Sequence, residues 1–140
     1  MMKTAPVELY NRIRNEFVGK IQYIDEASPS EPEIDPIKGC GCWGFVWFLE
    51  NECGIVFPKD GWEFLRSSVA VKDPAQFLDV AVFKAFGISR THVGMMLNDR
   101  LMVHCSRQGG GVSIDDIRLP PWIDNRGKIR HTLLRHPSLA

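Results

Sequence analysis

Cysteines and histidines are the residues of this 140-residue sequence whose types and positions suggest chemistry. Cys42 follows Gly41 and opens an apolar segment, so we expect it in the first turn of a buried helix. Backbone amides and the positive end of the helix dipole stabilise a thiolate there, which makes Cys42 a candidate nucleophile. The alternative is a small apolar core residue, because free cysteines are among the most buried residues. Cys40 is a second candidate thiol, but it lies in a loop. His131 and His136 are expected at the surface.

His92 and His104 are twelve residues apart, in two β-rich segments that are joined at Asn98-Asp99. A hairpin centred on Asn98 would place them opposite one another on one face, with Cβ atoms about 5 Å apart. One imidazole could then orient the other. A turn centred between Asn98 and Asp99 would instead place His92 opposite Cys105. The remaining alternative is that the two histidines are unrelated strand residues.

These side chains depend on elements that the hydrophobic pattern predicts. Apolar residues at helical spacing predict an amphipathic helix over 7–18, a buried helix over Cys42–Glu52, and a short helix capped by Asp60. β-rich runs separated by turn residues follow, at 80–86, 93–97, 101–105, 112–117 and 129–134. Helices followed by strands are typical of an α+β domain with an antiparallel sheet.

The composition predicts one domain, 1–140, and excludes several classes of function. Hydrophobic residues make up 44% of the chain, enough for a core, and 17 basic residues balance 17 acidic ones. A chain without net charge lacks the field that holds nucleic acid. No stretch approaches the roughly 18 apolar residues of a membrane helix. We therefore expect no nucleic-acid or membrane partner. Three prolines in residues 25–38 predict an extended surface loop.

Three blocks of the sequence resemble the NlpC-type cell-wall cysteine peptidases, a bacterial family with a compact papain-like fold. The segment GCWGFV at 41–46 is similar to the family's nucleophile block, in a Cys-Trp-Gly form that resembles members encoded in phage tail gene clusters. The segment LDVAVF at 78–83 resembles the opening strand. The segments HVGMML at 92–97 and LMVHC at 101–105 resemble the histidine strand and the strand that returns from it. Together the blocks span about residues 17–118.

The resemblance implies a catalytic triad. Cys42 would be the nucleophile, His92 the general base and acid, and His104 the residue that orients His92. Tyr23 would match a tyrosine that helps to bind the oxyanion, although residues 25–38 lengthen its interval to Cys42. A packed aromatic side chain is the alternative for Tyr23.

Two positions depart from the family's pattern. Gly41 replaces the aspartate usual before the nucleophile, and Leu78 replaces the glycine usual before Asp79. Neither position belongs to the implied triad.

The resemblance also implies a substrate and a location. The substrate would be the stem peptide of peptidoglycan, cleaved at an amide bond through a thioacyl intermediate, with no cofactor and no metal. Phage tail proteins are the second expected class of partner. The N-terminus has no apolar stretch followed by a small-residue cleavage site, so we expect synthesis in the cytoplasm without a signal peptide and association with a phage particle.

Three other interpretations use the same residues. The chain could be a phage tail-tip assembly protein whose peptidase site is dispensable, or a thiol amidase or acyltransferase that acts on another substrate. Alternatively, Cys40, Cys42, His104 and Cys105 could hold zinc. The Cys-x-Cys and His-Cys spacings are unlike those of ordinary structural zinc sites, which argues against the third interpretation.

Overall fold

The computed structural model describes residues 3–24, 39–86 and 90–140, and the predicted loop over 25–38 lies outside the described residues. Its helices are α1 (Val7–Arg12), α2 (Cys42–Glu52), α3 (Gly61–Ser67) and a C-terminal 3₁₀ turn (Pro137–Leu139). The helices predicted at 42–52 and after Asp60 are confirmed. Asp60 caps α3 by accepting hydrogen bonds from two backbone amides of its first turn.

The helix predicted over 7–18 changes its winding. It is α-helical only as α1, and Ile13–Phe17 continue as a π-helix that ends before Val18. Side chains four positions apart lie on one face of a helix in either winding. Ile13 and Phe17 both reach the core in this way, with exposed fractions of 0% and 6%. The apolar spacing predicted the buried face but not the change in winding.

Six strands form one antiparallel sheet in the order β1-β6-β2-β3-β4-β5. They are β1 (Val69–Val71), β2 (Val80–Phe86), β3 (Arg90–Met96), β4 (Leu101–Ser106), β5 (Gly111–Asp116) and β6 (Thr132–Arg135). The α+β class with an antiparallel sheet is therefore confirmed.

Two strand predictions need correction. The sequence did not predict β1, because three residues are too few to show an alternating pattern. The run predicted at 129–134 is a strand only from Thr132 onward, and Ile129 instead forms an isolated bridge with Ile123.

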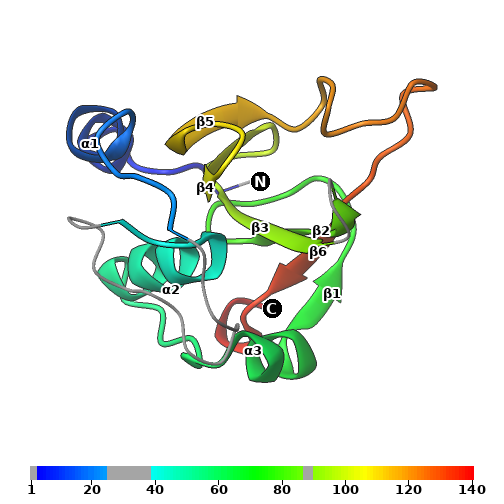
Figure 1. Ribbon diagram of the computed structural model, residues 1–140. Coiled ribbons are helices and arrows are strands. Elements are labelled where there is room, and N and C mark those ends of the chain that lie inside the picture. Colours follow the sequence, from blue (N-terminus) through cyan, green and yellow to red (C-terminus); the bar gives the residue numbers. More distant parts are fainter. Residues whose placement is uncertain (1–2, 25–38, 87–89) are drawn as a thin grey trace.

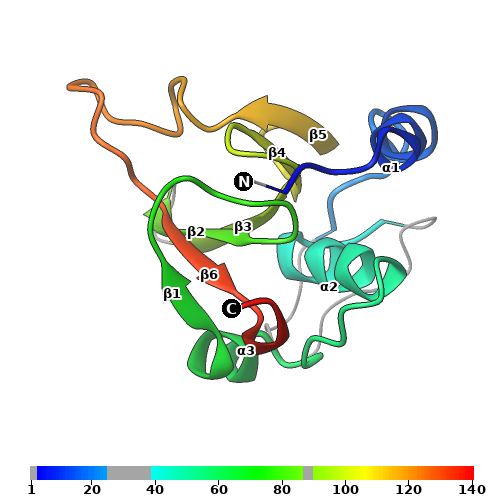
Figure 2. The same cartoon turned by 180° about the vertical axis from the view of Figure 1, so that it is seen from behind.

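The helices lie together on one side of the sheet, and the segment between β5 and β6 runs over the other side (Figure 1). The reverse view shows the same arrangement of the helices, the sheet and this segment (Figure 2). Two buried clusters fill the helix side, around Phe45 and Met95 and around Trp43 and Val93. A third cluster on the opposite face packs Trp122 against residues of β2, β3 and β4. Among the described residues, no helix has the length and apolar character needed to cross a membrane.

A buried ion pair joins the beginning of β2 to β6. Asp79, 1% exposed at its side chain, accepts two hydrogen bonds from the Arg135 guanidinium at 2.7 and 2.8 Å. Leu78, just before it, has a φ of +79°, a left-handed conformation that is strained for leucine and easy for glycine. The unusual residue at 78 therefore occupies a backbone conformation that suits glycine, while its side chain packs in the core.

Glu50 of α2 is fully buried next to this ion pair. Its two carboxyl oxygens have no hydrogen-bond partner among the described residues. Burial raises the pKa of Glu50 well above its usual range, and the nearby Asp79 carboxylate raises it further. The native state therefore keeps a proton on Glu50 at pH values where the unfolded chain has lost it.

Replacing Glu50 with methionine should stabilise the fold. Because the folded pKa is raised, the stability lost through Glu50 grows as the pH rises above about 4.5, by up to about 1.4 kcal/mol per pH unit. In urea titrations, the free energy of unfolding of the Glu50→Met variant should exceed that of the unaltered chain by about 1–3 kcal/mol at pH 8 and by less at pH 4.5. Glu52→Met, at a solvent-exposed position of the same helix, is the matched control and should change stability by less than about 0.5 kcal/mol. An equal or smaller gain at pH 8 than at pH 4.5 would contradict this account.

Candidate functional site

Cys42 is the first residue of the 11-residue helix α2. Gly41 is its N-cap and provides no side-chain hydrogen bond to the first turn. The dipole of a helix and the amides of its first turn favour a negative charge at this end. Cys42 is half-buried and packs against the cluster that contains Trp43 and Val93. The first turn of α2 therefore shares a cluster with Val93, the residue that follows His92 on β3.

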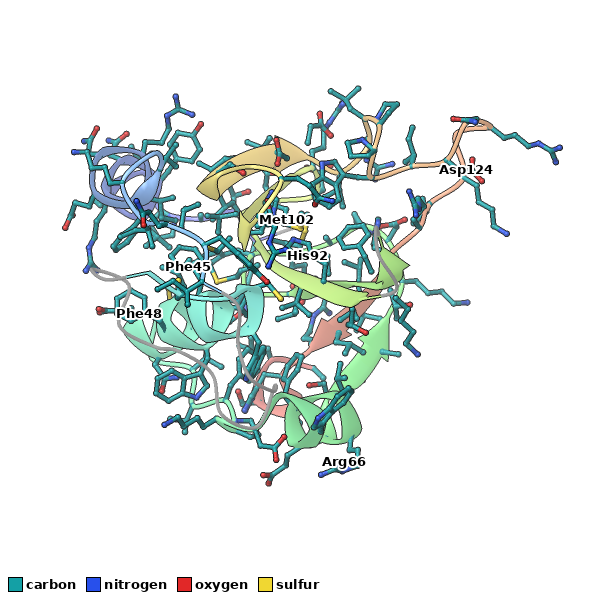
Figure 3. All side chains as sticks on the ribbon, in the orientation of Figure 1. Phe45, Phe48, Arg66, His92, Met102 and Asp124 are labelled. Carbon is teal, nitrogen blue, oxygen red and sulfur yellow. The ribbon has the colours of Figure 1, made fainter. Side chains whose placement is uncertain are left out.

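His92 and His104 are in direct contact. The Nε2 atom of His92 and the Nδ1 atom of His104 share a hydrogen bond at 2.9 Å, and the two rings meet edge to face. Figure 3 shows His92 in the middle of the molecule, whereas Arg66 and Asp124 lie at its periphery. The prediction that the two imidazoles meet is confirmed.

The hairpin register that brings them together is neither of the two that the sequence suggested. Met95 pairs with Val103 and Met96 with Met102, so the turn is centred on Asp99. The reason is the Asn98 side chain. Its oxygen accepts hydrogen bonds from the backbone amides of Arg100 and Leu101 at 2.8 and 2.7 Å, and these bonds favour a turn longer than either of the two predicted. The even spacing still keeps both histidines on one face, but as diagonal neighbours.

Gly94 gives the histidines room. Continuing the register places Gly94 opposite His104 on the same face. A Cβ atom at Gly94 would lie 2.3 Å from the Met102 sulfur and 3.1 Å from the His104 Cβ. A side chain at this position would therefore have to displace the Met102 side chain and would crowd His104.

Trp122 covers both imidazoles. Its ring stacks on His92 at a centroid distance of 5.9 Å and meets His104 edge to face at 5.0 Å. Burial, together with the neighbouring His104, lowers the pKa of His92 to about 3, and Asp115 opposes the shift. The His92 imidazole is therefore neutral at neutral pH, the form that can accept a proton.

His131 packs nearby, against Phe83, and its side chain is only 4% exposed. The expectation that His131 lies at the surface was therefore wrong.

Two residues of β5 that the sequence analysis missed extend the contact. Asp115 Oδ2 lies 2.6 Å from His104 Nε2, and Ser113 Oγ lies 3.2 Å from the same nitrogen. The hydrogen bond from His104 is the main reason that the pKa of Asp115 is lowered. Ser113 pairs with His104 in the β4–β5 register, and Asp115 follows on the same face. An alternating Ser-x-Asp pattern in the strand after the second histidine was the available signal.

A cleft of about 670 Å³ opens beside this row of side chains. It brings solvent to Asp115, whose side chain is 41% exposed, while His104 stays 1% exposed. The cleft is lined by His104, Ser106, Gln108, Gly109, Asp115, Asp116, Leu119, Pro120, Pro121, Trp122 and Arg130.

Tyr23 lies beside the beginning of α2 despite the long interval in sequence. It forms an isolated parallel bridge with Cys40, and the amides around it exchange hydrogen bonds with that segment. Its ring is half-buried against the core, and the Arg107 guanidinium lies 5.6 Å from the ring centroid. The structure therefore places Tyr23 close in space to the chain that leads into Cys42.

Two of the other thiols, those of Cys40 and Cys105, lie in the core. Cys40 and Cys105 are buried in the same core cluster, where the Cys105 thiol donates a hydrogen bond to the Cys40 carbonyl at 3.2 Å. Cys105 and His104 are successive strand residues and point to opposite faces, so they cannot share a metal ion. Within the described ranges, no three histidine, cysteine or acidic side chains gather as metal ligands.

Comparison with known proteins places these features in a family context. The profile of the NlpC/P60 family matches residues 27–131. A solved structure of an NlpC/P60 family protein from Bacillus cereus is similar to this chain with a TM-score of 0.52 and 27% identity, over 67% of this chain and 31% of that one. This chain thus spans about a third of that protein. A search of the curated proteins found no match.

A second solved structure shares the fold. It is the P60 domain of an antigen from M. avium subspecies paratuberculosis, with a TM-score of 0.51 and 21% identity, over 91% of this chain and 96% of that domain. At this identity the similarity concerns the fold alone.

The lowered pKa of His92 predicts a pH-dependent stability. The unfolded chain binds a proton on this ring below about pH 6.5, whereas the folded chain does not until about pH 3, so the native state loses stability as the pH falls through this window. When the pH falls from 6.5 to 4.5, the free energy of unfolding measured in urea titrations should decrease by about 2 kcal/mol less for the His92→Gln variant than for the unaltered chain. Parallel losses in the two proteins would contradict a neutral, buried His92.

Proposed function

We propose that this chain, which belongs to the NlpC/P60 family, is a cysteine peptidase that cleaves amide bonds in the stem peptides of peptidoglycan. Members of this family are generally cysteine peptidases, and family membership is consistent with a cell-wall substrate. The observation that carries the proposal is the hydrogen-bonded pair of His92 and His104, which is covered by Trp122 and lies on β3 and β4, the two strands that pack against α2. A buried imidazole held by a second ring is the arrangement that a thiol nucleophile needs beside it.

In the proposed reaction, Cys42 is the nucleophile. Neutral His92 takes the thiol proton, which requires its Nδ1 atom within about 4 Å of the sulfur. The thiolate attacks the amide carbonyl and forms a tetrahedral oxyanion. This collapses to a thioacyl enzyme as His92 returns the proton to the leaving amine, and water, activated by His92, then releases the acid and restores the thiol.

The proposal assigns supporting roles to His104 and Tyr23. His104 accepts or donates at the far nitrogen of His92 and so holds the ring in orientation. The Cys42 backbone amide and the Tyr23 hydroxyl would bind the oxyanion, a role supported by the bridge that brings Tyr23 next to the α2 segment.

The proposed setting is a phage particle that delivers the enzyme to the cell wall. Support comes from the Cys-Trp-Gly form of the nucleophile block, which resembles that of members from phage tail gene clusters. Tail proteins would then be the protein partners.

Cleavage of purified stem peptides, followed by mass spectrometry, tests the activity. The unaltered chain should release fragments that differ at one amide bond, and Cys42→Ala should release none while keeping the same unfolding temperature within about 2 °C, because a small residue at a helix start is replaced by another small one. Intact peptides after incubation with the unaltered chain would contradict this substrate.

Alkylation by iodoacetamide is the control that separates a wrong substrate from an inactive thiol. Burial and the nearby Glu50 and Glu52 carboxylates raise the pKa of Cys53 to about 11, which makes it the matched slow thiol. Cys42 should react at least about 20-fold faster than Cys53 at pH 7.5. Fast labelling without cleavage would indicate amidase or acyl-transfer chemistry on another substrate, and equal labelling would contradict Cys42 as nucleophile.

His104→Ala should lower kcat about 10²-fold and leave KM within about threefold, because His104 acts on His92 and not on the substrate. His104→Gln, whose side-chain oxygen can accept a hydrogen bond from His92, should recover part of kcat. Thermal unfolding of both variants shows whether the fold is kept. An alanine variant with unchanged kcat would remove His104 from the proposed machinery.

A further inference from the structure

The contact between the histidines does not end at His104. His104 Nδ1 faces His92 at 2.9 Å, and its other nitrogen, Nε2, faces Asp115 Oδ2 at 2.6 Å. Ser113 Oγ closes a triangle with these atoms, 3.2 Å from His104 Nε2 and 3.3 Å from Asp115 Oδ2. A row of four side chains thus runs from β3 across β4 to β5.

The donors and acceptors along this row determine which nitrogen of each ring carries a proton. An ionised carboxylate can only accept hydrogen bonds, so the 2.6 Å contact requires a proton on His104 Nε2. A neutral His104 then has a lone pair on Nδ1, which must accept from a proton on His92 Nε2. A neutral His92 that carries its proton on Nε2 has no proton on Nδ1. That nitrogen is the one turned away from His104.

We propose that Asp115 is a positioning residue that fixes the proton on His104 Nε2 and thereby leaves Nδ1 of His92 unprotonated as the base. The catalytic consequence rests on the proposed function, whereas the proton positions do not. When His92 takes the thiol proton it becomes a cation, and His104 continues to accept from its Nε2–H. The charge on Asp115 stabilises that cation through the intervening ring.

The surroundings favour this direction over its reverse. If Asp115 were replaced by a group that donates, His104 could carry its proton on Nδ1 and donate to His92 Nε2. His92 would then carry its proton on Nδ1 and could not accept one from a thiol. The lowered pKa of Asp115 keeps the carboxylate ionised at neutral pH, so the acceptor at this end of the row persists. Ser113 donates to the same carboxylate and keeps it in place.

Nitrogen NMR of protein labelled with ¹⁵N-histidine tests the proton positions at pH 7.5, without any substrate. In the unaltered chain, His92 and His104 should both show the Nε2–H tautomer. Asp115→Asn exchanges an oxygen acceptor for an amide that can also donate, so both rings should shift measurably toward Nδ1–H. Asp116→Asn is the matched control, because Asp116 contacts Arg100 instead of His104 and should leave both tautomers unchanged.

Kinetics on a cleaved stem peptide test the consequence. Asp115→Asn should lower kcat about 10²-fold with KM within about threefold, and Asp116→Asn should keep at least half of kcat. A merely structural Asp115 would lower stability without moving the tautomers.

Three results would overturn the proposal. The first is an Nδ1–H tautomer of His92, or a doubly protonated His104, in the unaltered chain. The second is an Asp115→Asn variant with unchanged tautomers, and the third is one with shifted tautomers but unchanged kcat. If the chain cleaves no stem peptide, the proposed function fails while the NMR result still decides the proton positions. If Asp115→Asn does not fold, the unaltered spectrum and that of Ser113→Ala, which should keep Nε2–H on both rings, decide them instead.

Discussion

The hydrogen bond between His92 and His104 depends on one register of the β3–β4 hairpin. The Asn98 side chain sets that register by accepting hydrogen bonds from the Arg100 and Leu101 amides, and Gly94 leaves room for the Met102 and His104 side chains. A shift by one residue would turn one histidine to the opposite face, since strand side chains alternate. The contact between the two imidazoles therefore depends first on how the backbones of β3 and β4 pair.

Layering around the sheet gives the two ends of the site different environments. On the helix side, α2 presents Cys42 at its amino end, where the dipole favours an anion. On the other face, Trp122 excludes water from the imidazoles and keeps His92 neutral, while the cleft leaves Asp115 partly in solvent and ionised. In the proposed reaction, this arrangement would combine a neutral His92 in the resting state with stabilisation, by Asp115, of the cation formed on proton transfer.

Much of the fold could be predicted because its signals are local. The helix at 42–52 has an apolar pattern and a terminal glycine, and α3 has an aspartate cap, so both follow from short-range rules. The change of winding at Ile13 and the short strand β1 could not be predicted, because packing against distant residues decides them. Glu50 is a similar case, since its position in the helix pattern gives no sign that its carboxyl is buried beside Asp79.

The sequence by itself determined the types of the candidate site residues and placed His92 and His104 on the two successive strands of one hairpin. The tertiary structure decided the register that brings both histidines to one face, the cover provided by Trp122 and the contact of His104 with Asp115. The physical reason is that parity along a strand is fixed by the backbone, whereas the pairing of one strand with the next depends on turn hydrogen bonds and on close packing. Both involve side chains whose partners are far away in the sequence.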